Sequence, residues 1–175
     1  MNLEVCIGIQ KSGDIMDNFF DYTFHYLKKR FENFASVKDS KLLLLKNNDE
    51  DLETMAKTQY RSEIFVYGKD ITVRLQLFFK PDQIISTFPH LDLRSQDNEN
   101  YNKIYDFFNE VCNMSCGKVK SALEESGMLV ALSLPISVET YKVRKILTSE
   151  VLPHYQDVAL EYNNQIVLYS RVSLN

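Results

Sequence analysis

Several features that mark common protein classes are missing from this chain of 175 residues. There is no Trp, and the three cysteines, Cys6, Cys112 and Cys116, have neither disulfide-framework nor Cys-x-x-Cys spacing. An odd number of cysteines without such spacing is consistent with a reducing compartment. The sequence also lacks a glycine-rich phosphate loop and a dinucleotide-binding fingerprint, so these two nucleotide-binding motifs are excluded.

Charge of a single sign is lacking as well. The chain has 24 acidic and 20 basic residues, a formal net charge of −4, and the two signs are interspersed. This pattern gives no electrostatic footprint for nucleic acid or for an anionic membrane surface, so neither partner is expected. No secretory leader is recognisable, and no apolar run approaches the roughly 20 residues needed to span a bilayer. We therefore expect a cytoplasmic protein.

Residues that could ligate a metal ion are few and scattered. His25, His90 and His154 lie far apart in sequence, which argues against a histidine metal site and against a Cys/His nucleophile. Cys112 and Cys116 lie one helical turn apart and could in principle ligate a metal, but small buried thiols are common core residues. We predict no metal site and no cofactor belonging to the chain itself.

The chain is organised around the segment 101–138. Apolar and small side chains recur there at helical spacing and predict a long helix that packs its broad apolar face on a sheet: Ile104, Phe107, Phe108, Val111, Met114, Ser115, Val119, Ala122 and Leu123. Ser126-Gly127 is a usual stop signal for a helix. Residues 128–138 then alternate as a strand, with Val130, Leu132, Leu134, Ile136 and Val138 facing one way. Pro135 cannot donate to a strand ladder, so it predicts an edge or a bulge.

The opposite face of this helix is polar. It carries Lys103, Asp106, Glu110, Asn113, Gly117, Lys120 and Glu124. The spacing places the carboxylate of Glu110 beside the carboxamide of Asn113. Gly117, with Ser115 and Cys116 beside it, makes the surface one turn further on unusually low, so a partner could approach the backbone there.

The remaining elements suggest that the chain repeats itself. We expect a long helix at 14–34 capped by Ser12-Gly13, a hairpin of 63–67 and 71–79 turning at Gly68-Lys69, a short helix at 81–88, and a last hairpin of 157–162 and 165–173 across Asn163-Asn164. Residues 42–45 are too few to assign, 47–57 is the best loop candidate, and 141–150 is a helix or irregular.

This order predicts a single domain over 1–175 with a weak internal duplication of 14–88 and 101–175. Aligning Phe19-Phe20 with Phe107-Phe108 places Tyr22 opposite Glu110 and His25 opposite Asn113. Only the second half would then keep the polar pair. The alignment leaves open whether the surface at Tyr22 and His25 has a role.

The run Glu110-Val-Cys-Asn113-Met-Ser-Cys-Gly117-Lys, followed about fifteen residues later by Leu132-Ser-Leu-Pro135, resembles the signature of the CheX/CheC/FliY phosphatases of bacterial chemotaxis. Cys112, where that family often has a small residue, and Lys118 depart from the pattern. The resemblance implies an α+β domain, with two long, roughly antiparallel helices packed on one side of a largely antiparallel sheet. The single polar pair is more similar to CheX than to the two-site CheC.

The resemblance also implies a function and its residues. The expected activity is hydrolysis of the aspartyl phosphate of a CheY-like response regulator in chemotaxis or two-component signalling. Glu110 and Asn113 would be catalytic, and Asp106, Gly117 and Lys120 would lie on the docking face. The required Mg²⁺ would belong to the regulator, and the protein would pair as a homodimer through its sheet.

The two catalytic candidates suit different tasks. A carboxamide oxygen can accept a hydrogen bond from the attacking water while its nitrogen donates to a phosphoryl oxygen, so Asn113 is the candidate for positioning water. A carboxylate beside an anionic phosphate needs a cation, and by resemblance Glu110 would meet the conserved lysine of the receiver.

Three alternatives stay open from the sequence. The chain could be an adaptor of the same fold that binds a receiver or another signalling partner without catalysis. Glu110 and Asn113 could merely keep a helix face soluble. A deep apolar pocket between helices and sheet would instead favour a small-molecule binding module.

Overall fold

The computed structural model describes residues 12–45, 60–91, 102–139 and 153–175. The loop predicted at 47–57 and the helix or irregular segment predicted at 141–150 lie outside these residues. In chain order the described elements are α2 (Ser12–Ala35), β1 (Lys41–Leu44), β2 (Tyr60–Gly68), β3 (Thr72–Phe79), α4 (Pro81–Thr87), the 3₁₀ turn η1 (Pro89–Leu91), α5 (Asn102–Glu125), β4 (Val130–Leu132), β5 (Ile136–Glu139), β6 (His154–Tyr162) and β7 (Gln165–Leu174).

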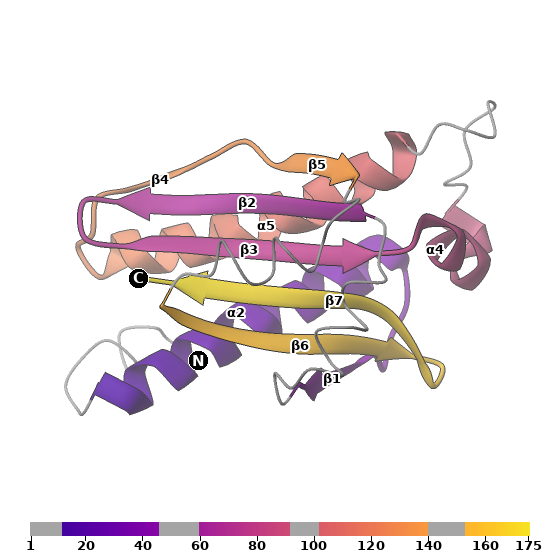
Figure 1. Cartoon of the computed structure of the whole chain (residues 1–175), viewed down its shortest axis with the longest axis horizontal. Coiled ribbons are helices and arrows are strands. Elements are labelled where there is room, and N and C mark those ends of the chain that lie inside the picture. The colour runs from indigo at the N-terminus through magenta and orange to yellow at the C-terminus, as the bar shows by residue number, and fades with distance from the viewer. Residues whose placement is uncertain (1–11, 46–59, 92–101, 140–152) are drawn as a thin grey trace.

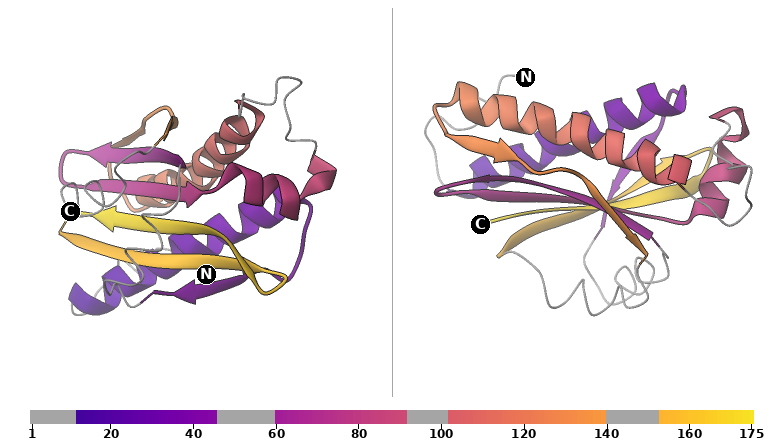
Figure 2. Two further views of the ribbon diagram at one scale, coloured as in Figure 1. Left: turned by 45° about the vertical axis from the view of Figure 1, so that its right-hand side comes forward. Right: turned by 90° about the horizontal axis from the view of Figure 1, so that it is seen from above.

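The strands form one seven-stranded antiparallel sheet in the order β1-β6-β7-β3-β2-β4, with β5 also paired to β2. The two long helices run in opposite directions and cover the same face of the sheet (Figure 1 and Figure 2). The expected α+β class with a large antiparallel sheet is confirmed. The description as two long helices was incomplete, because the short helix α4 follows β3.

Each half of the chain contributes the same kinds of element. A long helix is followed by an outer strand, β1 in the first half and β4 with β5 in the second, and then by a hairpin. The outer strand of each half pairs with the hairpin of the other half, β1 with β6 and β4 with β2. The internal duplication itself stays a prediction.

The core lies between the two long helices and the sheet. Leu27 and Phe31 of α2, Phe108 of α5 and Leu75 of β3 are all fully buried there. The ring of Phe108 stacks on Phe79 of β3 at a centroid distance of 3.8 Å. Aromatic and aliphatic burial thus fixes both helices on the sheet.

One side of the predicted apolar face of α5 was placed wrongly. Met114 is 36% exposed, whereas Cys112 and Cys116 are fully buried as free thiols. The buried face of α5 thus includes the two thiols, which are small and apolar, and leaves Met114 at its margin. The interpretation of the cysteines as core residues is confirmed.

Burial has a pH consequence for these thiols. Burial raises the pKa of the Cys116 thiol above its ordinary value. The pKa of Cys112 is also raised well above its ordinary value, chiefly by burial and further by the neighbouring Cys116 and Glu63. The folded state therefore keeps both thiols neutral while the unfolded chain ionises them above about pH 8.5. The stability they confer is present below that pH and is lost as pH rises, by up to about 1.4 kcal/mol per thiol per pH unit.

We therefore expect urea midpoints to fall steeply between pH 8.5 and 10.5. The double variant Cys112→Ala/Cys116→Ala should lose less stability over the same interval, although it is less stable at pH 7. Equal slopes for the two proteins would contradict this explanation.

Local signals fixed the ends of several elements. The N–H of Gly127 donates to the carbonyl of Glu124 at 2.9 Å, and the N–H of Met128 donates to Leu123 at 3.0 Å, the two bonds of a Schellman cap. Gly127 has φ +89°, where a side chain would be strained, so the predicted stop is confirmed. Asn163 and Asn164 form the predicted β6–β7 turn with φ 52° and 59°. At the other end, α2 begins at Ser12, so Ser12-Gly13 lies in its first turn instead of preceding it.

None of the helices in the described ranges is long and apolar enough to cross a membrane.

Candidate functional site

The polar face of α5 lies on the outside of the domain. Glu110 is exposed and Asn113 is half-buried, and both point away from the face that carries Phe108 and Val111. Side chains three residues apart on a helix are neighbours, about 5–6 Å apart at Cβ. The structure therefore presents a carboxylate and a carboxamide together, on a rigid helix that is packed on the sheet.

The other members of the predicted docking face lie on the same surface. Asp106 is exposed, and neither Asp106 nor Glu110 forms an ion pair with another described residue. Lys120 pairs with Glu124, with Nζ and Oε1 2.6 Å apart. The surface around Asn113 therefore presents two unpaired carboxylates, a charge pattern suited to a cation supplied from outside.

Gly117 leaves a shallow place on this surface. A Cβ built at this position would meet no atom within 4 Å apart from its chain neighbours and the backbone of its own helix, so the low surface predicted there faces open space. No packing contact with the described residues requires a glycine at this position, and glycine costs helix stability relative to alanine.

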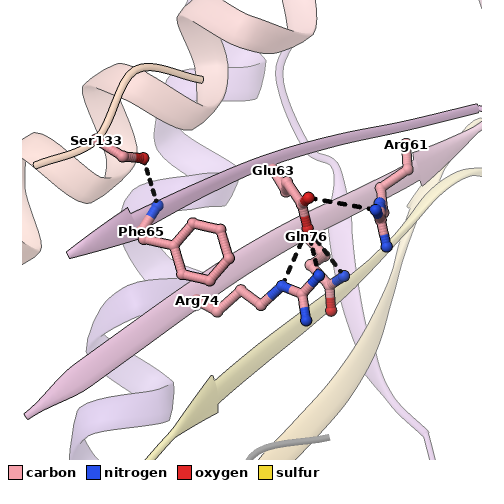
Figure 3. Close-up of polar contacts among 6 residues, drawn as sticks. All are labelled: Arg61, Glu63, Phe65, Arg74, Gln76 and Ser133. Atoms are coloured by element: carbon pink, nitrogen blue, oxygen red, sulfur yellow. Dashed lines mark hydrogen bonds and ion pairs between the residues drawn. The ribbon is translucent and has the colours of Figure 1, made fainter. Parts of the chain in front are cut away.

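The edge of the sheet beside α5 contains the predicted interruption at Pro135. Strand β4 ends at Leu132, which pairs with Val66, and β5 begins at Ile136, which pairs with Glu63. Residues 133–135 thus oppose only residues 64 and 65 of β2, an extra residue of the kind found in a β-bulge. At this bulge a side chain takes the place of a backbone acceptor, because the Oγ of Ser133 accepts a hydrogen bond from the N–H of Phe65 at 3.0 Å (Figure 3).

This bulge overturns part of the predicted alternation. Leu132 pairs with Val66 and faces the helices, whereas Ile136 pairs with Glu63 and faces the other side of the sheet, 51% exposed. One extra residue moves every following side chain to the opposite face. Ser137 thereby points toward α5, where its Oγ donates to Oδ1 of Asn109 at 2.8 Å.

A second polar cluster occupies the sheet face opposite the helices. The carboxylate of Glu63 accepts from Arg61 Nη2 at 3.2 Å, from Arg74 Nη2 at 2.6 Å and from Gln76 Nε2 at 3.3 Å (Figure 3). All four residues are at most 7% exposed. The carboxylate of Glu63 is bound by three side chains and the cluster is buried, which is the arrangement of a structural network and not of an open site.

The α2 positions aligned with Glu110 and Asn113 have a different environment. Tyr22 is buried beside Ala122, with its ring 4.8 Å from that of Tyr26. His25 is exposed, and the edge of its ring meets Tyr26. The structure therefore does not repeat the acid and amide pair at these two positions.

A cavity of about 370 Å³ lies beside His25 and not at Asn113. It is lined by Asp21, Phe24, His25, Lys28, Leu42, Leu44, Gln156 and Val158. The cavity is formed by α2 with β1 and β6 and opens to the outside. Glu110 and Asn113 lie on the outer face of α5 and are not among the residues that line this cavity.

Within the described ranges, no three His, Cys, Asp or Glu side chains gather closely enough to hold a metal ion.

No protein-family model and no curated protein matches the sequence. Solved structures nevertheless show that the chain has the fold of the CheX and CheC chemotaxis proteins. CheX from Vibrio vulnificus is 16% identical, with 90% of this chain and 99% of that chain covered and a TM-score of 0.61.

Two further structures are similar over comparable lengths. CheX from Borrelia burgdorferi, solved as a CheX–CheY–BeF₃–Mg²⁺ complex, is 9% identical over 90% of this chain and 97% of that one, with a TM-score of 0.68. FliY from Thermotoga maritima is 12% identical over 94% and 91%, with a TM-score of 0.52. The resemblance inferred from the motif is confirmed at the level of the fold.

Proposed function

We propose that the chain is a phosphatase that hydrolyses the aspartyl phosphate of a CheY-like receiver domain in the cytoplasm. The observation that carries the proposal is the pair Glu110 and Asn113 on the outer face of α5, in a fold shared with a CheX protein that was solved with CheY. The helix is anchored by its core face, so the pair is held in one orientation.

Asn113 and Glu110 have different roles in this proposal. Asn113 can accept a hydrogen bond from water through its carboxamide oxygen and donate to a phosphoryl oxygen through its nitrogen. Hydrolysis of a phosphoryl group depends mainly on such positioning and on charge neutralisation, so no nucleophile is needed from this chain. Glu110 anchors the complex by pairing with a cation of the receiver, and the Mg²⁺ is the receiver's own.

The test is the decay of a phosphorylated CheY-like receiver, followed with and without this protein in the presence of Mg²⁺. The proposal is supported if one molecule of this protein accelerates phosphate loss from many receiver molecules in turn. Binding of the phosphorylated receiver without acceleration would assign the chain to the alternative, a non-catalytic adaptor. The homodimer expected from the resemblance stays a prediction.

The shallow surface at Gly117 yields a separate prediction. Gly117→Ala should raise the free energy of unfolding by about 1 kcal/mol, because alanine favours the helix and its methyl group meets open space. Gly117→Leu should fold equally well but raise the receiver concentration needed for half-maximal acceleration by about tenfold, if the partner's backbone approaches here.

The matched control is Lys118→Leu, which places the same side chain on the neighbouring exposed position outside the predicted docking face. Thermal unfolding and a receiver titration measure the two effects separately. Unchanged titrations for Gly117→Leu would remove Gly117 from the docking face.

A further inference from the structure

A short chain of hydrogen bonds joins the sheet to α5 immediately before the catalytic candidates. Ser62 of β2 and Ser137 of β5 have their hydroxyl oxygens 2.6 Å apart, and Ser137 Oγ donates to Asn109 Oδ1 at 2.8 Å. Since the hydroxyl proton of Ser137 is used on Asn109, Ser62 must be the donor to Ser137. The bonds run in one direction, from β2 through β5 to the helix, and such a series is mutually strengthening.

The bulge at residues 133–135 is what makes this link possible. Ser62 and Val66 of β2 face the helices, and their partners Ser137 and Leu132 are an odd number of residues apart. In a regular strand two such residues would face opposite sides. The extra residue turns Ser137 toward α5, where Asn109 lies.

Asn109 occupies a particular place on the helix. It directly precedes Glu110 and lies four residues, about one turn, before Asn113, on the border between the buried face and the polar face. The packing of neighbouring core residues such as Phe108 and Val111 sets which side of α5 meets the sheet, but it is non-directional and supplies no directional contact against small rotations of the helix. A hydrogen bond is directional and limits rotation about the helix axis.

We propose that Asn109 and Ser137 are positioning residues, which through Ser62 fix the rotation of α5 and thereby the direction in which Glu110 and Asn113 face the receiver. This inference rests on the proposed phosphatase function for its kinetic consequence. A misplacement of about 1 Å in a catalytic constellation can reduce the rate about 100-fold.

The test compares Asn109→Ala, Ser137→Ala and the double variant in the receiver assay. We expect each single variant to lower the maximal acceleration about tenfold, while the receiver concentration for half-maximal effect changes less than about threefold. The double variant should be no slower than either single one, because both remove the same link. Ser137→Thr, which retains the hydroxyl, should recover most of the rate.

Ser126→Ala is the control for a general loss of stability. Ser126 directly follows the C-terminal end of α5, far from Asn109. Its hydroxyl donates to the carbonyl oxygen of Leu123 at 2.7 Å. Its acceleration should equal that of the wild type. A normal maximal rate for Asn109→Ala and Ser137→Ala would overturn the proposal.

A second readout does not require activity. In the free protein, Ser137→Ala should move the side-chain amide resonances of Asn113, and Ser126→Ala should not. Unmoved Asn113 resonances would refute the positioning role even if the wild type proved inactive. Inactivity of the wild type beside shifted resonances would instead contradict only the phosphatase function.

Discussion

Replacing Asn113 by Ala should reduce the accelerated decay of the phosphorylated receiver by 100-fold or more, on the order expected when a group that orients the reacting water is lost. The complex should persist, because Glu110 and the remainder of the polar face are unchanged. Stability should also be preserved, since Asn113 is only half-buried, its side chain forms no hydrogen bond with another described residue, and alanine favours the helix. Receiver phosphate loss and receiver binding are measured on the same preparations.

Glu110 and Lys118 supply the comparison for this experiment. Glu110→Ala should chiefly weaken docking, because the exposed carboxylate is unpaired within the described part of the domain and is proposed to meet a cation of the partner. Lys118→Ala changes the adjacent surface outside the Glu110–Asn113 pair. It should leave both phosphate loss from the receiver and receiver binding unchanged. An Asn113→Ala protein that still accelerates phosphate loss would contradict the assignment of Asn113 as the residue that positions the water.

The features that the sequence predicts well are local. The end of α5 at Gly127 and the β6–β7 turn at Asn163-Asn164 depend on backbone conformations that few residue types adopt readily. The polar face with Glu110 and Asn113 follows from helical period alone, and the structure places both residues outside the core. Their catalytic roles remain proposals, because placement on a surface does not establish chemistry.

The features that could not be predicted depend on partners far away in sequence. Pro135 located the interruption of the edge strand, but the reversal of Ile136 and Ser137 depends on how this segment pairs with β2, more than 60 residues earlier. The helix period likewise could not decide between Met114 and Cys116 as a core residue, because the side of α5 that meets the sheet is set by packing. The link between Ser137 and Asn109 was therefore missed, although both residues belong to the organising segment.

Strand β3 is buried on both of its faces. Val73 and Leu75 face the helices, while Arg74 and Gln76 share the other face, as the period of two requires. Arg74 is only 7% exposed and Gln76 only 3%. A charged residue in an alternating strand ordinarily indicates solvent, whereas here the guanidinium of Arg74 is buried in an ion pair with Glu63 and over the ring of Phe65.

Another buried ion pair on that face should matter most for stability. Arg171 of β7 binds Asp157 of β6 in a bidentate manner, Nε to Oδ1 at 2.7 Å and Nη2 to Oδ2 at 2.6 Å. The two side chains are 2% and 0% exposed, and the guanidinium also lies 4.5 Å from the ring centroid of Tyr155. Both charges are thus removed from water and depend on each other.

Asp157→Ala should therefore lower the free energy of unfolding by about 3–5 kcal/mol, because it leaves the Arg171 charge buried without its carboxylate. For a chain of this size the melting temperature should fall by roughly 6–20 °C. Lys41→Ala, which removes the exposed pair with Glu161, should cost less than about 1 kcal/mol. Urea unfolding of both variants measures the difference.

A double variant separates the cost of a broken pair from the net value of the pair. Asp157→Leu combined with Arg171→Met removes both charges and fills a similar volume, so it should recover much of the stability lost in Asp157→Ala. If the double variant were as unstable as Asp157→Ala, packing around Asp157 would account for the loss in place of the broken ion pair. A loss below about 1 kcal/mol for Asp157→Ala itself would mean that water or another group reaches Arg171 once the carboxylate is gone.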